Sequence, residues 1–164
     1  MGVELYRVDD RLIHGQVVVG WGQPMSLGFI ALVDDEVANS DWEQELYRMA
    51  VPPDMDVFFE PVAGVAGRLA RWRADERPGI LLTGDIGTMA RLVDACDEIR
   101  AVNLGGIHHR ADRTHRLRYI YLSPVEESLL QQLASKGVEI TAQDVPSARP
   151  VQLDELLQAE GEPE

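Results

Sequence analysis

Short apolar runs alternate along the chain with amphipathic stretches. Residues 3–8 alternate between apolar and polar side chains, which predicts a strand with one buried face. Residues 28–33 and 79–84 are continuous apolar runs, typical of strands buried on both faces of a parallel sheet. Further strands are predicted over residues 57–59, 99–104, 119–122 and 138–142.

Helical signals lie between these runs. Ser40 and Glu43 have the spacing of a capping box, and Pro124 stands at a favoured first-turn position after Ser123. The predicted helices cover residues 15–21, 41–51, 62–74, 88–96 and 124–135. This alternation favours an α/β fold: a doubly wound, mostly parallel central sheet of about seven strands with helices on both faces. We expect one domain over residues 1–153 and an acidic tail, residues 154–164, that frays.

Composition narrows the class of protein. The 164 residues suit one globular domain, and 45% hydrophobic residues exclude wholesale disorder. The net charge of −13 argues against binding nucleic acid or anionic lipid through the global field. A single cysteine, Cys96, excludes an internal disulfide and favours a cytoplasmic protein. The three tryptophans, Trp21, Trp42 and Trp72, fall in predicted helices, where core packing is expected.

Candidate chemistry follows the predicted strands. In an open α/β sheet, ligands bind at the carboxyl ends of the strands. Residues 9–17 follow the first strand, residues 34–36 the second, residues 84–85 the fourth and residues 105–110 the fifth. Histidine, arginine, carboxylate and glycine residues gather in these segments, so the sequence predicts a polar site at this edge.

The segment after the first strand carries the densest chemistry. His14 precedes Gly15 at the predicted start of a helix, where free amides and the helix dipole favour an anion. A histidine placed there can attack phosphorus, and Arg7 and Arg11 can neutralise phosphate oxygens. A capping histidine among surface ion pairs remains the alternative interpretation.

The other histidines offer a different hypothesis. His108, His109 and His115 could bind a divalent metal. Adjacent residues usually point apart, however, and no second cluster has metal-ligand spacing. We therefore predict no metal site.

One motif resembles a known family. Residues 7–17, Arg-Val-Asp-Asp-Arg-Leu-Ile-His-Gly-Gln-Val, followed by Trp21, resemble the signature of the IIB component of the mannose/fructose/sorbose branch of the bacterial sugar phosphotransferase system (PTS). The resemblance continues, without a large gap, from about residue 3 to about residue 153. Further similar segments are residues 34–38, 52–53, 102–108 and 137–140.

The resemblance implies a function and partners. His14 would take a phosphoryl group on Nδ1 from a phosphohistidine of the IIA component. It would then pass the group to a sugar held by the membrane components IIC and IID. Met1 stands just before the similar region, so we expect a separate IIA protein. No cofactor is implied, the oligomeric state stays open, and the sugar is set largely by the membrane components.

The resemblance also implies residue roles. Arg11 matches a family arginine that would contact the phosphoryl oxygens, and Asp10 is predicted to orient the imidazole or Arg11. Other residues are predicted to bind phosphate or to form a wall of the site, namely Arg7, Gly15, Gln16, Thr83, Gly105, Gly106 and His108. A regulatory phosphorelay module of the same fold, without sugar transport, is the alternative function.

Overall fold

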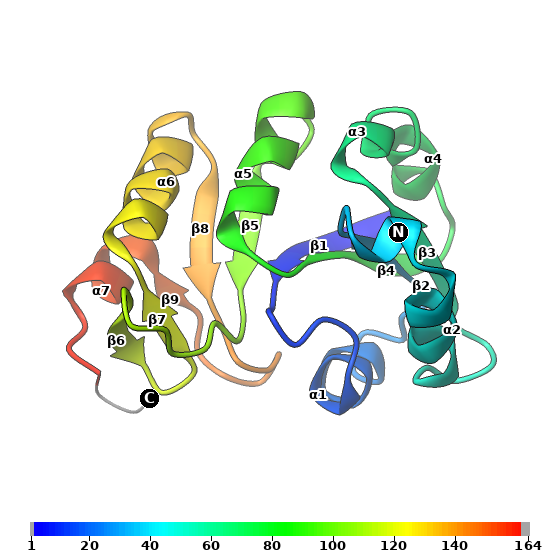
Figure 1. Cartoon of the computed structure of the whole chain (residues 1–164), viewed down its shortest axis with the longest axis horizontal. Coiled ribbons are helices and arrows are strands. Elements are labelled where there is room, and N and C mark those ends of the chain that lie inside the picture. Colours follow the sequence, from blue (N-terminus) through cyan, green and yellow to red (C-terminus); the bar gives the residue numbers. More distant parts are fainter. Residues whose placement is uncertain (1, 162–164) are drawn as a thin grey trace.

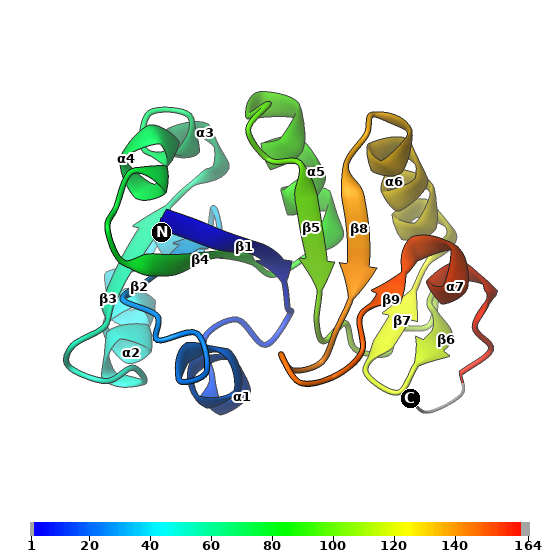
Figure 2. The same cartoon turned by 180° about the vertical axis from the view of Figure 1, so that it is seen from behind.

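A seven-stranded sheet forms the centre of the molecule (Figures 1 and 2). The computed structural model describes residues 2–161, except for the side chain of residue 16. The strand order is β3-β2-β4-β1-β5-β8-β9, and a separate hairpin pairs β6 with β7. The strands are β1 (Gly2–Val8), β2 (Phe29–Val33), β3 (Asp56–Glu60), β4 (Pro78–Thr83), β5 (Ala101–Leu104), β6 (Thr114–Leu117), β7 (Ile120–Leu122), β8 (Glu139–Ala142) and β9 (Val151–Gln152).

Strand β1 lies at the centre of the sheet, paired in parallel with β4 on one side and with β5 on the other. The chain winds outward from β1 to β2 and β3, returns through β4, and continues on the far side at β5. The ladders of this seven-stranded sheet are parallel except between β8 and β9. The predicted doubly wound, mostly parallel sheet is confirmed, and the strand order reverses beside β1, where ligands of such sheets bind.

Helices cover both faces of the sheet, as predicted. The helical segments are α1 (Gly15–Val17), the π-helix η1 (Val18–Gly22), the 3₁₀-helix η2 (Val37–Asn39), α2 (Asp41–Met49), α3 (Val62–Val65), α4 (Leu69–Arg73), α5 (Ile86–Ala95), α6 (Pro124–Ser135) and α7 (Leu153–Gln158). Side chains of α3 to α7 pack in one core cluster, whereas those of α1, η1 and Tyr47 of α2 pack in the other. Within residues 2–161, no helix has the length and apolar character needed to cross a bilayer.

Several predicted elements differ from the observed ones. The strand predicted over residues 119–122 lies outside the main sheet, in the β6–β7 hairpin, and β9 is the seventh strand instead. The helix predicted over residues 62–74 is divided into α3 and α4, and Gly67, a poor helix former, lies between them.

The acidic tail is more ordered than predicted. Residues 153–158 form α7, because Leu156 is fully buried in the main core cluster and Leu153 is 9% exposed. Burial of two leucines outweighs the acidic composition, so the expectation of fraying from residue 154 was wrong as far as residue 158. Residues 162–164 of the predicted tail lie outside the described residues.

Candidate functional site

The segment after β1 is fixed by backbone hydrogen bonds to both neighbouring strands. The amide of Asp9 donates to the carbonyl of Thr83 at 2.9 Å, and the amide of Asp10 donates to that of Gly106 at 2.9 Å. Leu12 has a φ of +60°, an uncommon conformation for a branched side chain. The loop therefore leaves the sheet along a defined and locally strained path before the helical segment 15–22 begins.

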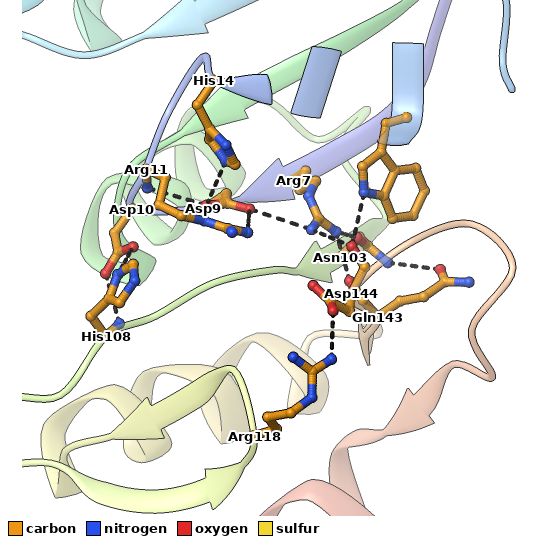
Figure 3. Close-up of polar contacts among 11 residues, drawn as sticks. Arg7, Asp9, Asp10, Arg11, His14, Asn103, His108, Arg118, Gln143 and Asp144 are labelled. Atoms are coloured by element: carbon orange, nitrogen blue, oxygen red, sulfur yellow. Dashed lines mark hydrogen bonds and ion pairs between the residues drawn. The ribbon is translucent and has the colours of Figure 1, made fainter. Parts of the chain in front are cut away.

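The carboxylate of Asp9 is the centre of the site (Figure 3). It accepts two parallel hydrogen bonds from the guanidinium of Arg11, Nε to Oδ1 at 3.0 Å and Nη2 to Oδ2 at 2.9 Å. Arg7 Nη2 lies 3.4 Å from Oδ2, and the Asp9 side chain is fully buried. Burial alone raises the pKa of Asp9, but the hydrogen bonds from Arg11 and the charge of Arg7 outweigh it and lower the pKa. Asp9 is therefore ionised.

Arg7 lies beneath the site and joins three parts of the chain. Its guanidinium donates to the side chain of Asn103, to the carbonyl of Gln143 at 2.9 Å and to that of Asp144 at 3.2 Å. It also lies over the ring of Trp21, 4.5 Å from the centroid, and the indole Nε1 donates to the Asp144 carbonyl at 3.2 Å. Burial lowers the pKa of Arg7 to about 10, which still leaves it charged.

His14 lies next to this charged pair. Its Nε2 is 3.8 Å from Oδ1 of Asp9, and its side chain is 25% exposed (Figure 3). Burial lowers the pKa of His14, as do the charges of Arg11 and Arg7, while Asp9 opposes them. The ring is therefore mainly neutral near pH 7. A carboxylate beside Nε2 favours the proton on that nitrogen, which leaves the lone pair on Nδ1.

Asp10 lies against the loop after β5. Its Oδ2 accepts from the amide of His108 at 2.7 Å, and its Oδ1 is 2.6 Å from Nδ1 of the same residue. Asp9, not Asp10, therefore holds Arg11. Asp10 instead ties the two loops of the predicted site together, with His108 at the exposed rim.

The two glycines after β5 leave room for the arginines. A Cβ on Gly105 would lie 2.2 Å from Nη2 of Arg7, and a Cβ on Gly106 would lie 2.9 Å from Nε of Arg11. The structure thus brings both glycines to the site, as expected for residues that permit close approach.

The other residues predicted to bind phosphate or to form a wall of the site differ in how they contribute to it. Thr83 is fully buried and supports Asp9 through its carbonyl. Gly15 begins α1 and is exposed, whereas the side chain of Gln16 lies outside the described residues. Arg7 is fully buried beneath Asp9, where it was predicted to contact phosphate. In the structure its guanidinium instead lies beside the Asp9 carboxylate and supports that residue.

Four residues of the site were missed or misassigned from sequence. Asn103 is a polar residue inside an apolar strand, and Asp144 follows the last parallel strand at the same edge as His14. Both features could have indicated a site residue from the sequence alone. Trp21 was predicted only to pack in the core, but its indole Nε1 also donates a hydrogen bond to the carbonyl of Asp144. Asp9, the neighbour of the predicted Asp10, is the residue that holds Arg11.

The three other histidines are engaged in ring contacts or in a contact with a carboxylate. The rings of His109 and His115 both pack on Tyr121, with centroids 5.4 and 4.4 Å away. His108 is engaged by Asp10. Among residues 2–161, no group of three or more His, Cys, Asp or Glu side chains converges as metal ligands.

The fold and the site define an α/β protein with a neutral, partly exposed histidine beside a paired arginine. The chain matches the model of the family described as "PTS system sorbose subfamily IIB component" over residues 3–164. It is 30% identical over 153 residues to the sorbose-specific EIIB component of Klebsiella pneumoniae, covering 90% of each chain. The protein belongs to this sorbose subfamily of PTS IIB components.

A further sequence relative and two solved structures are also PTS components or domains similar to this chain. The mannose-specific EIIAB component of Escherichia coli K12 is 28% identical over 158 residues, which are 96% of this chain and 49% of that relative. The chain thus spans about half the length of the mannose-specific relatives it matches. The crystal structure of manxB from Thermoanaerobacter tengcongensis superposes with a TM-score of 0.85 at 29% identity, covering 95% of each chain. The IIBSor domain of the Klebsiella pneumoniae sorbose permease gives a TM-score of 0.85 at 26% identity, covering 96% of this chain and 98% of that one.

Proposed function

We propose that this chain transfers phosphoryl groups in a sugar phosphotransferase system, working on the cytoplasmic side of the membrane beside its permease. His14 accepts the group from a phosphohistidine of a separate IIA protein and passes it to a sugar held by membrane components IIC and IID. The arrangement of His14, Asp9 and Arg11 carries this proposal. It supplies a neutral imidazole, a carboxylate beside Nε2 and an adjacent fixed positive charge.

The first step forms one nitrogen–phosphorus bond and breaks another. The lone pair on Nδ1 of His14 attacks the phosphorus carried by the donor histidine. The donor nitrogen leaves with the electron pair of its bond to phosphorus. Asp9 keeps the proton on Nε2 and stabilises the positive charge that develops on the His14 ring.

The second step passes the group to a hydroxyl of the sugar. The hydroxyl oxygen attacks phosphorus, the bond to Nδ1 breaks, and its electron pair returns to His14. The hydroxyl proton moves to the released Nδ1 and then to water. In both steps negative charge is spread over the three equatorial oxygens of the transferring group.

Arg11 is the residue we assign to those oxygens. Its side chain is 28% exposed, and Asp9 holds the guanidinium in a fixed orientation. A planar, pre-oriented fork stabilises phosphoryl charge better than a mobile ammonium group does. The amides of Gly15 and Gln16, at the start of the helical segment, are further candidates for binding the group.

The test is phosphoryl labelling followed by chase. Incubation with labelled phospho-IIA should place an acid-labile, base-stable phosphate on His14. The His14→Ala variant should remain unlabelled under the same conditions. Stable phosphate on serine, threonine or aspartate, or full labelling of His14→Ala, would contradict the proposal.

A second measurement, transfer of the label from His14 to sugar, distinguishes sugar transport from a regulatory phosphorelay. Adding membranes that contain IIC and IID, together with sugar, should move the label to the sugar. Label that stays on His14 whichever PTS sugar is added would instead favour a regulatory phosphorelay module.

A further inference from the structure

Helix α2 has an unusual surface. None of its residues is buried, although it packs on the sheet through Tyr47, whose ring lies 6.4 Å from that of Phe59. On the outer side, Trp42 is 68% exposed, Leu46 53% and Met49 75%. These residues follow the i, i+4, i+7 spacing that places side chains on one face of a helix. The expectation that Trp42 packs in the core was therefore wrong.

This apolar stripe, Trp42, Leu46 and Met49, accounts for three of the five large hydrophobic side chains exposed among the described residues. Trp and Met are residues that anchor protein interfaces, and this spacing is that of a helix laid into an apolar groove. Exposed apolar residues gathered on one helix mark an interaction surface more strongly than scattered ones do.

The charge around the stripe selects its partner. Helix α2 itself carries three acidic residues against one arginine, Arg48. The whole segment 34–56 carries eight acidic residues, of which Asp35 and Asp56 are paired with Arg91 and Arg77 from other segments, so the surroundings of the stripe remain acidic. A second copy of this chain would bring the same charge, and an anionic lipid surface would also repel it. The fitting partner is a protein surface with an apolar groove bordered by lysine and arginine.

The position of α2 connects the stripe to the site. Strand β2 runs parallel to β4, and β4 to β1, so the carboxyl end of β2 lies at the same edge of the sheet as the His14 loop. The chain reaches α2 eight residues after β2 ends, between Val33 and Asp41. Helices α1 and α2 also cover the same face (Figures 1 and 2). A partner seated on α2 therefore reaches the side of the molecule that carries His14.

We infer that the stripe on α2 docks onto the cytoplasmic, Lys/Arg-bearing loops of the membrane protein that receives the phosphoryl group. The inference rests on the proposed function for the identity of that protein. Integral membrane proteins concentrate lysine and arginine in their cytoplasmic loops, which supplies the complementary charge. The apolar side chains provide affinity, and the acidic residues steer the encounter.

The experiment compares binding with labelling. The triple variant Trp42→Gln, Leu46→Gln, Met49→Gln removes the stripe without touching a buried residue. Val125→Gln is the matched control, because Val125 is 70% exposed on another helix, α6. Binding is measured by sedimentation with inverted vesicles that contain IIC and IID, and with vesicles of the same lipids alone.

We expect wild type and Val125→Gln to bind the IIC/IID vesicles equally. The triple variant should bind about 10-fold or more weakly, and wild-type binding should weaken as salt is raised. Phospho-IIA should label the triple variant on His14 at the wild-type rate. Onward transfer from the triple variant should need a correspondingly higher protein concentration.

Four results would overturn the inference: no wild-type binding to IIC/IID vesicles, equal binding by the triple variant, equal binding to lipid alone, or slower labelling of the triple variant by phospho-IIA. A wild-type dimer that the triple variant abolishes would instead assign the stripe to a second copy and overturn it too. Failure of His14 labelling in the wild type would refute the proposed function. Binding to the IIC/IID vesicles needs no phosphate, so that arm decides the docking surface separately.

Discussion

The same local arrangement of aspartate and arginine occurs at both ends of β4. Arg11 donates from its backbone amide, Nε and Nη2 to Asp9, and Arg77 donates from the same three groups to Asp75. Asp9 contacts the carboxyl end of β4 through Thr83, whereas Asp75 and Arg77 precede its amino end. Local geometry is thus shared by two regions with different surroundings.

Burial and additional partners separate the two pairs. The Asp9 side chain is fully buried and also faces Arg7 and His14, whereas Asp75 is 21% exposed and Arg77 40%. The Asp75–Arg77 pair closes a loop before a strand, and water can replace much of its interaction. The Asp-x-Arg motif is therefore common to both places, and what distinguishes residues 9–11 is that a histidine and a second, buried arginine lie beside the same carboxylate.

Stability should separate the pairs most strongly. Asp9→Asn leaves the buried charge of Arg7 without its carboxylate, so we expect the free energy of unfolding to fall by about 3–5 kcal/mol. Asp75→Asn should lower it by about 1 kcal/mol or less, because solvent screens that pair. Chemical denaturation of both variants at pH 7 measures the difference. Equal losses would mean that Asp9 is no more than a loop-closing residue.

Phosphoryl transfer should separate the arginines next. Arg11→Lys keeps the charge but loses the planar fork, so we expect labelling by phospho-IIA to slow by about 100-fold. Arg77→Lys and Arg116→Lys should transfer at nearly the wild-type rate. Single-turnover labelling on folded samples gives the rates. Arg11→Lys at the control rate would remove Arg11 from the mechanism.

The glycine that borders Arg11 should have a smaller effect. In Gly106→Val the added Cβ lies 2.9 Å from Nε of Arg11 and forces the guanidinium away from Asp9. We expect transfer to slow by about 10-fold in protein that remains folded. Gly67→Val is the comparison, because its Cβ would meet nothing closer than 3.8 Å and lies far from the site in sequence. A lowered thermal midpoint with a normal rate in Gly106→Val would make Gly106 a structural turn residue only.

The titration of His14 should show the smallest change. Burial and the charge of Arg11 lower the pKa of His14, so Arg11→Gln should raise it toward its usual value, whereas Arg77→Gln should leave it unchanged. Since the unfolded chain binds this proton more readily, wild-type stability should fall as pH drops below about 6.5. The Arg11→Gln variant should lose less of its own stability over the same interval. NMR titration of the His14 ring gives the pKa directly, and an unchanged value in Arg11→Gln would contradict the electrostatic account.

Periodicity was sufficient for six strands of the main sheet, but it missed the edge strand β9 and the hairpin strand β6. Long apolar runs such as residues 28–33 and 79–84 can be buried only inside a sheet, so the pattern predicted them correctly. Strand β9 has two residues and β6 is mostly polar, and neither carries a strand signal of its own. These elements form because the rest of the sheet and the hairpin partner are already present.

The site was predictable as far as its loops, not as far as its contacts. His14 and Arg11 follow from their place after a central strand. Asp9 and Asp10 are identical neighbours, so the sequence does not show which of the two carboxylates faces Arg11. In the structure Asp9 faces Arg11 and Asp10 faces His108. The burial of Arg7 depends on Asn103 and on the carbonyls of Gln143 and Asp144, which lie 96 to 137 residues away in sequence.

The floor beneath the reactive histidine is made late in synthesis relative to the histidine itself. His14 and Arg11 leave the ribosome long before residues 143 and 144, whose carbonyls complete that floor by accepting hydrogen bonds from Arg7. A nascent chain therefore carries the reactive imidazole long before it carries the environment that keeps Asp9 ionised and Arg11 in place. Competence to accept a phosphoryl group should arise only once β8 has joined the sheet, so that a truncated or stalled product would take no phosphate from the donor pool.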